Sequence, residues 1–192
     1  MDAFLLSAAV IFVAELGDKS QLMAMTFAAR YTVREVLIAI TGATLIVHLA
    51  SVAIGALVGK GFADSQWLIS IIAGVAFLAF AAWTLRGDAL TAEEEEKARR
   101  SSGAALLAVG TAFFLAELGD KTMLATITLA TREGWFGTWI GSTLGMVAAD
   151  ALAIGVGVLL GRNLPERVIK IGAAAAFLVF GVLLIVQGIT AR

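Results

Sequence analysis

Long apolar segments dominate this sequence and leave few ways for the chain to fold. Six of them are long enough to cross a bilayer as helices, since about 30 Å of hydrocarbon requires about 20 helical residues. The expected spans are Ala3–Ala29, Val36–Gly59, Trp67–Leu85, Ala104–Thr131, Trp135–Leu160 and Val168–Ile189. None of these runs shows the in/out alternation of a barrel strand. The sequence therefore predicts an all-α integral membrane protein with six transmembrane helices.

The composition agrees with a protein that lives in a lipid bilayer. Hydrophobic residues make up 60% of the 192 residues and charged residues only 15%, whereas soluble domains carry about 25% charged residues. The net charge is -1 and no basic stripe is present, so we expect no nucleic-acid partner. The absence of cysteine excludes a disulfide framework, a thiolate metal site and a thiol nucleophile. The composition is compatible with a homodimer.

A repeat divides the chain into two related halves. The segment Ala14–Ser20, which reads AELGDKS, returns 102 positions later as Ala116–Thr122, which reads AELGDKT. Each half holds three expected spans, and an odd number of spans forces the halves into opposite orientations. We therefore predict two inverted three-helix repeats, residues 1–86 and 104–192, joined by a charged linker at residues 87–103. Together they form one membrane domain.

The linker and the basic residues predict the orientation in the membrane. Glu93, Glu95 and Glu96 stand four residues before Lys97, Arg99 and Arg100, a spacing typical of a solvated helix. Most of the other Lys and Arg residues fall on the same side of the membrane as this linker. By the positive-inside rule, we expect the linker in the cytoplasm and both termini outside.

Charged side chains recur near the middle of the first and fourth spans. The two copies of the repeat place six of them there: Glu15, Asp18 and Lys19, and Glu117, Asp120 and Lys121. Each costs about 2.5–3.5 kcal/mol at the centre of a spanning helix, so we expect them to serve a function. Within each copy the glutamate precedes the lysine by four residues, and we expect the two to pair on one helix face. The glycine between the two acids permits local unwinding.

A histidine and a further acid occupy equivalent positions of the second and fifth spans. His48 lies near the middle of the second span, and its counterpart in the repeat is Asp150. With Asp150 included, five acids face two lysines at one depth, and a metal ion, protons or water must neutralise the excess. Oxygen ligands without thiolate suit Ca²⁺, Mn²⁺ or Mg²⁺. Protons compete with a metal for the same oxygens, which is a physical basis for cation/proton exchange.

Other interpretations of the same residues stay open. The acids and lysines would also suit salt bridges that only fix helix packing, or the lining of a passive divalent-cation channel. A metal-dependent intramembrane hydrolase has less support, because the chain has one histidine, no cysteine and no His-Glu-x-x-His motif. We therefore expect no enzyme and no prosthetic group. Whether His48 and Asp150 bind metal, carry protons or only pack is undecided at this stage.

Two copies of Glu-x-Gly-Asp-Lys/Arg-Ser/Thr make the chain similar to a known family. The sequence resembles the small Ca²⁺/Mn²⁺ cation–proton antiporters, which include bacterial manganese exporters and Golgi ion-homeostasis proteins. The resemblance implies a secondary transporter of a bacterial inner membrane that exports Mn²⁺ or Ca²⁺ from the cytosol in exchange for protons. The transported ion is then its substrate, and alternating access operates around a site at the middle of the membrane.

The resemblance also implies roles for individual residues. It implies Glu15, Asp18, Glu117 and Asp120 as metal ligands, and Ser20, Gln21 and Thr122 as supporting polar groups. From their charge and position, and not from the resemblance, we expect Lys19 and Lys121 to act as internal counter-ions that hold the acids when the metal leaves. The chain departs from the family at Met123, where a glutamine often follows the second motif. Met123 is either a packing residue or a softer ligand that favours Mn²⁺ over Ca²⁺.

Overall fold

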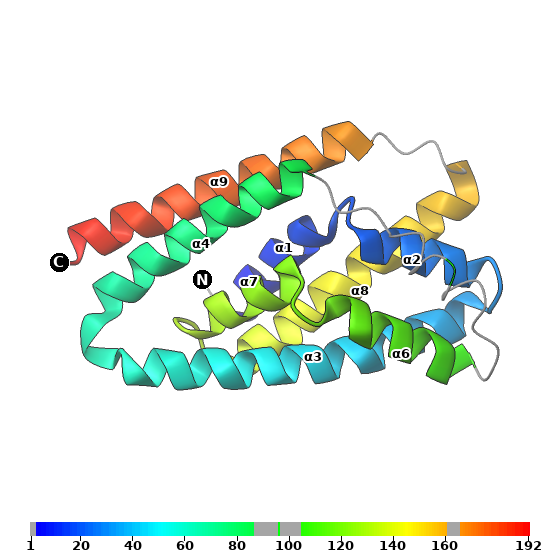
Figure 1. The fold of residues 1–192 in the computed structure, drawn as a ribbon, viewed down its shortest axis with the longest axis horizontal. Coiled ribbons are helices and arrows are strands. Elements are labelled where there is room, and N and C mark those ends of the chain that lie inside the picture. The colour runs from blue at the N-terminus through cyan, green and yellow to red at the C-terminus, as the bar shows by residue number, and fades with distance from the viewer. Residues whose placement is uncertain (1–2, 87–95, 97–104, 161–165) are drawn as a thin grey trace.

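The computed structural model describes residues 3–86, 96, 105–160 and 166–192, and these are arranged as helices joined by short turns (Figure 1). The elements are α1 (Ala3–Glu15), α2 (Lys19–Ala28), α3 (Val33–Gly61), the 3-10 turn η1 (Ala63–Ser65), α4 (Gln66–Arg86), α6 (Ala105–Glu117), α7 (Lys121–Ala130), α8 (Trp135–Leu160) and α9 (Glu166–Thr190). Of the expected linker helix, only Glu96 lies within the described residues.

Four helical segments in the described ranges are long and apolar enough to cross a membrane. They are Val33–Gly61, Ala63–Arg86, Trp135–Gly157 and Lys170–Thr190. The expected first and fourth spans instead divide into α1 with α2 and α6 with α7. The prediction of one continuous helix over each of these two spans is therefore wrong.

A glycine in the left-handed backbone conformation produces each break. Gly17 has φ 74° and Gly119 has φ 79°, values that glycine adopts without the steric penalty of a Cβ. Asp18 then caps the next helix, where its Oδ1 accepts a hydrogen bond from the backbone N–H of Lys19 at 2.8 Å. The glutamate of each copy thus ends one helix and the aspartate begins the next.

Helices from the two halves pack against each other in matching pairs. α1 lies along α8, α6 lies along α3, and α3 and α8 cross near the middle of the molecule (Figure 1). Glycines allow close approaches between helices: a Cβ at Gly141 or Gly145 of α8 would collide with the backbone of α1, and a Cβ at Gly55 of α3 would collide with the backbone of α7. Such close packing is typical of small residues four apart in membrane helices.

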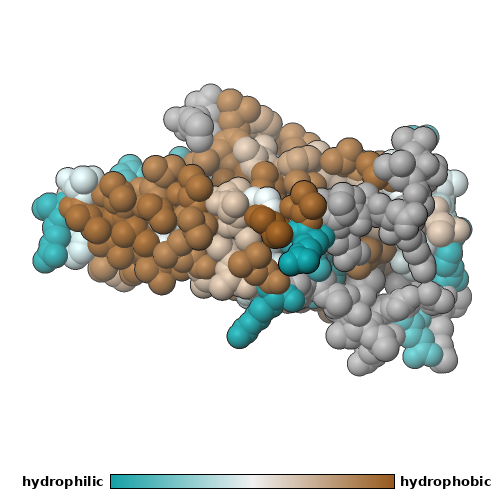
Figure 2. Space-filling view, turned by 90° about the horizontal axis from the view of Figure 1, so that it is seen from above, coloured by the Kyte–Doolittle hydropathy of each residue, from teal (hydrophilic) through white to brown (hydrophobic). Residues whose placement is uncertain are grey.

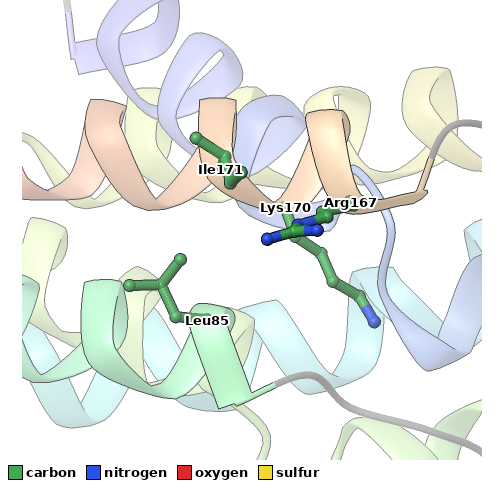
Figure 3. Close-up of a pocket in the computed structure, with 4 residues that line it drawn as sticks. All are labelled: Leu85, Arg167, Lys170 and Ile171. Atoms are coloured by element: carbon green, nitrogen blue, oxygen red, sulfur yellow. The ribbon is translucent and has the colours of Figure 1, made fainter.

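The helices α4 and α9 pack side by side along their length, and the C-terminus of α9 lies at one end of the molecule (Figure 1). α9 also contacts α1, and α4 also contacts α7. Within the described residues, α2 and α6 make no comparable contact with α4 or α9. A cavity of about 410 Å³ lies between the end of α4 and the start of α9, lined by Leu85, Arg167, Lys170 and Ile171 (Figure 3). This cavity opens between the two helices of the pair, at the end where α4 leads toward the linker.

The outer surface of this pair is strongly hydrophobic. Figure 2 shows a broad apolar area over the left part of the face seen from above, with hydrophilic residues at the ends and near the middle of the view. The α9 side chains exposed on the molecular surface include Leu178, Val179, Val182, Leu183 and Val186. Such an extended apolar surface is unfavourable in water and favourable in lipid.

Two hydrophobic clusters flank the helix breaks. One gathers side chains of α2, α3 and α6, including Phe27, Ile40 and Phe113. The other gathers side chains of α1, α4, α7 and α9, including Phe77 and Phe177. The breaks between α1 and α2 and between α6 and α7 therefore lie between two packed apolar regions.

Candidate cation site

The two helix breaks meet, and each lysine pairs with the aspartate of the opposite half. Lys121 Nζ lies 3.0 Å from Asp18 Oδ2, and both side chains are buried, with exposures of 3% and 1%. Lys19 Nζ lies 3.9 Å from Asp120 Oδ1, and Lys19 keeps 17% of its side chain exposed. The expected pairs of each lysine with the glutamate of its own copy are therefore wrong, because the helix ends between the two residues.

Both glutamates are buried, and each uses one oxygen for a hydrogen bond within its own copy of the motif. Glu15 Oε1 accepts a hydrogen bond from the Ser20 hydroxyl, and Glu117 Oε2 accepts one from the Thr122 hydroxyl at 2.8 Å. The second oxygen of each glutamate has no hydrogen-bond partner among the described residues. Buried polar atoms are nearly always satisfied in folded proteins, so these two oxygens are available to a ligand.

Gln21 and Met123 occupy the same position of the two breaks and act differently. Gln21 Oε1 accepts from the Gly17 N–H at 2.8 Å, while its Nε2 donates to the Ala149 carbonyl of α8 at 3.0 Å. Met123 Sδ accepts from the Gly119 N–H at 3.2 Å. Only the first break is tied by this position to the crossing helix. The Ala149 carbonyl was missed at the sequence level, since a backbone acceptor leaves no trace in residue type.

The structure separates the roles of Asp150 and His48. Both side chains are fully buried, and the carboxylate oxygens of Asp150 and the ring nitrogens of His48 have no hydrogen-bond partner among the described residues. Asp150 interacts electrostatically with Asp18, Glu15 and Glu117. No charged group acts comparably on His48 in the described part of the chain. Asp150 thus belongs to the acid cluster in this conformation, and His48 stands apart from it.

Comparison with known proteins identifies the family of this chain. The family described as "Divalent cation/proton antiporter GDT1" matches residues 3–92 and 105–192, which is nearly the whole chain. The chain belongs to this family. No solved structure matches the sequence.

Relatives within the GDT1 family include bacterial and chloroplast proteins. A Vibrio cholerae protein named "Putative manganese exporter" is 34% identical over 93% of this chain and 88% of that protein. Protein PAM71 of Arabidopsis thaliana, a chloroplast protein, is 31% identical over 98% of this chain and 56% of its own length. The GDT1-like protein sll0615 of Synechocystis is 29% identical over 95% of this chain and 96% of that protein. The chain therefore spans little more than half of PAM71.

The charge balance of this GDT1-family centre calls for a cation or for protons. Five buried acids, Glu15, Asp18, Glu117, Asp120 and Asp150, surround two lysines. Like charges repel strongly where water is excluded. The lysines compensate two of the acids, so the remaining carboxyl groups must bind protons or a metal ion.

In this conformation the lysines occupy space between the acids. Among the described residues, no three Asp, Glu or His side chains are arranged to hold a metal ion. The assignment of Glu15, Asp18, Glu117 and Asp120 as ligands therefore stays a prediction. None of these residues lines the 410 Å³ cavity between α4 and α9, whose Arg167 and Lys170 would repel a cation. The centre therefore provides buried carboxylate oxygens that can bind a lysine, a proton or a metal ion in turn.

Proposed function

We propose that this chain exports a divalent cation, Mn²⁺ in preference to Ca²⁺, from the cytosol in exchange for protons. The observation that carries the proposal is the pair of crossed contacts, Lys121 with Asp18 and Lys19 with Asp120, inside a buried excess of acid. A cation that enters must displace the lysines, and protons on the carboxyl groups must displace the cation. The name of the Vibrio cholerae relative supports manganese as the ion.

The proposed architecture is an inverted repeat with six spans, two of them broken. Residues 1–86 and 104–192 form the repeats, and residues 87–103 link them. Support comes from the matching packing of α1 on α8 and of α6 on α3. The proposed location is a bacterial inner membrane, with the linker in the cytoplasm and both termini outside. The partners are the transported ion, protons and lipid, and a homodimer is compatible with this arrangement.

The proposed cycle is alternating access around the two breaks. The separation of α4 and α9 from α2 and α6 supports a conformation that opens toward the linker side. An ion arriving from that side takes oxygens from Glu15, Asp18, Glu117 and Asp120, with Ser20, Gln21 and Thr122 orienting them. After the protein opens to the other side, protons bind the carboxyl groups and the ion leaves. Lys19 and Lys121 then return to the aspartates.

Transport by purified protein in liposomes tests the proposal. An imposed pH gradient should drive Mn²⁺ into vesicles that contain a manganese-sensitive dye, with protons moving in the opposite direction. Asp18→Asn and Asp120→Asn should reduce the rate more than about 100-fold, since each removes a charged ligand. Asp64→Asn, an exposed carboxylate in η1, is the matched control and should leave the rate unchanged.

The same assay separates an antiporter from a passive channel. A channel would carry Mn²⁺ down its own gradient with no pH difference and with no movement of protons. Manganese flux of that kind, or full activity of Asp18→Asn, would contradict the proposed exchange.

A further inference from the structure

His48 and Asp150 flank the point where the two halves of the molecule cross. The Thr44 hydroxyl on α3 donates a hydrogen bond to Met146 Sδ on α8 at 3.2 Å, and these two residues are equivalent positions of the repeat. His48 and Asp150 follow them by one helical turn, each on its own helix. In an inverted repeat, α3 and α8 run in opposite directions across the membrane. One turn further along α3 and one turn further along α8 therefore lie toward opposite membrane faces. The histidine and the aspartate then lie on opposite sides of the crossing.

Both residues carry buried polar atoms without a partner. His48 and Asp150 each have 0% exposure, and neither the ring nitrogens nor the carboxylate oxygens are hydrogen-bonded among the described residues. Burying such groups without a partner carries a large cost in free energy. Because two equivalent positions of the repeat both carry such a residue, we infer that each side chain gains a polar or ionic partner at some stage of the transport cycle.

In this conformation Asp150 lies next to a helix break, and His48 does not interact comparably with either break. Gln21 holds the first break to the Ala149 carbonyl, next to Asp150, and Asp150 interacts with Asp18. The equivalent residue of the second break, Met123, contacts the Gly119 N–H of its own break. The first break is therefore docked beside Asp150, while His48 has no such neighbour in the described part of the chain.

We propose that Asp150 and His48 are ligands of the transported ion in opposite states of the cycle. This inference rests on the proposed function, because alternating access in an inverted repeat exchanges the arrangements of the two halves. The conformation described here brings Asp150 to Asp18. The opposite conformation brings the second break to α3, where the His48 imidazole meets the ion held by Asp120. The ion thus exchanges a carboxylate for an imidazole as the site changes sides.

This exchange has two chemical consequences. Affinity for a hard dication falls as the number of anionic ligands falls, so the state with His48 binds the ion more weakly than the state with Asp150. Weak binding on the far side favours release there, as export requires. An imidazole nitrogen also suits transition metals better than Ca²⁺, so His48 favours Mn²⁺ over Ca²⁺.

A substitution that makes the two positions identical tests the proposal. His48→Asp gives both states a carboxylate, and His48→Gln removes the nitrogen ligand with a smaller change of charge. In liposomes, both variants should lower the preference for Mn²⁺ over Ca²⁺ by about tenfold, the scale of losing one ligand contact. His48→Asp should also make transport more sensitive to Mn²⁺ on the release side. Ser51→Ala is the matched control, since Ser51 is buried on the same helix and donates only to the Val47 carbonyl.

A spectroscopic measurement identifies the ligand directly. His48 is the only histidine of the chain, so protein purified without a histidine tag contains one imidazole. Pulsed electron paramagnetic resonance of the Mn²⁺-loaded protein should detect coupling to an imidazole nitrogen in the fraction of molecules that occupies the state with His48, and His48→Gln should remove it.

The outcomes separate this inference from the proposed function. An unchanged Mn²⁺ to Ca²⁺ preference in a folded His48→Gln protein that still transports Mn²⁺ overturns the role of His48. Wild-type protein that moves no Mn²⁺ under a pH gradient overturns the proposed function itself. Folding of each variant is checked by its elution as a single species in detergent and by its melting temperature.

Discussion

The two helix breaks share six consecutive residue types and the same backbone, yet they are held in place differently. Gly17 and Gly119 adopt nearly the same φ, 74° and 79°, and each break positions a glutamate, an aspartate and a lysine. The first break is tied to α8 through Gln21, whereas the second is closed by the sulfur of Met123. Leu118 of the second break is 48% exposed. Local sequence thus sets the shape of each break, and its neighbours set how firmly it is docked.

The two ion pairs also differ, since Lys121–Asp18 is shorter and more buried than Lys19–Asp120. Breaking them should change the stability of the protein more than any other substitution considered below. Asp18→Asn leaves Lys121 as a buried cation without its 3.0 Å partner, which should lower the free energy of unfolding by about 3–5 kcal/mol. Asp120→Asn should cost less, because Lys19 is partly exposed and its contact is 3.9 Å. Thermal unfolding of both variants in detergent measures the difference. Equal losses of stability would show that the two pairs are equivalent.

Replacing the lysine of each ion pair, instead of the aspartate, compares how strongly the two lysines compete with a metal ion. Lys121→Met deletes the cation that competes with a metal for Asp18, so Mn²⁺ affinity at neutral pH should rise about tenfold while turnover falls. Lys19→Met should change affinity less. Calorimetric titration with Mn²⁺ measures the affinities, and Arg132→Met, a change outside the acid centre, serves as the control. A weaker affinity in Lys121→Met would mean that this lysine orients the acids instead of competing for them.

The glycine conformation can be tested at the second break, where space is not limiting. A Cβ at Gly119 would meet no atom within 4 Å, so Gly119→Ala should cost only the backbone strain of about 1–2 kcal/mol. Gly119→Asn should cost less than Gly119→Ala, because asparagine tolerates the left-handed region. Melting temperatures of the two variants measure the order. The reverse order would indicate that the break is not left-handed in the membrane.

Exchange of the residues that differ between the breaks should have the smallest effect. Met123→Gln offers the second break the hydrogen bonds of the first, which should stabilise it by about 0.5–1.5 kcal/mol. An oxygen in place of sulfur should also shift ion preference toward Ca²⁺. Competition of Ca²⁺ with Mn²⁺ in liposomes measures the shift, and Gln21→Met provides the reciprocal change. Competition unaltered in Met123→Gln would place residue 123 outside the ion's path.

Much of the fold follows from residue order alone. Apolar length predicted the four long helices that the structure shows among its described residues, because hydrocarbon thickness imposes a nearly constant number of helical residues on each span. The repeated AELGDK segment located the acid centre and, through Gly17 and Gly119, a point where each helix could unwind. These properties depend on lengths, residue types and local backbone sterics, which neighbours in space change little.

The partners of the charged residues depended on contacts between the halves. From spacing alone, Glu15 and Lys19 were expected to pair, since four residues make one turn of an unbroken helix. The left-handed glycine ends that helix, and the opposing break brings Lys121 to Asp18 and Lys19 to Asp120. The difference between Asp150, which interacts with Asp18, and His48, on which no charged group acts comparably in the described part of the chain, arises likewise from how one break docks on α8. Electrostatic partners are chosen by distance through space, and that distance is set by the packing of segments about a hundred residues apart in the chain.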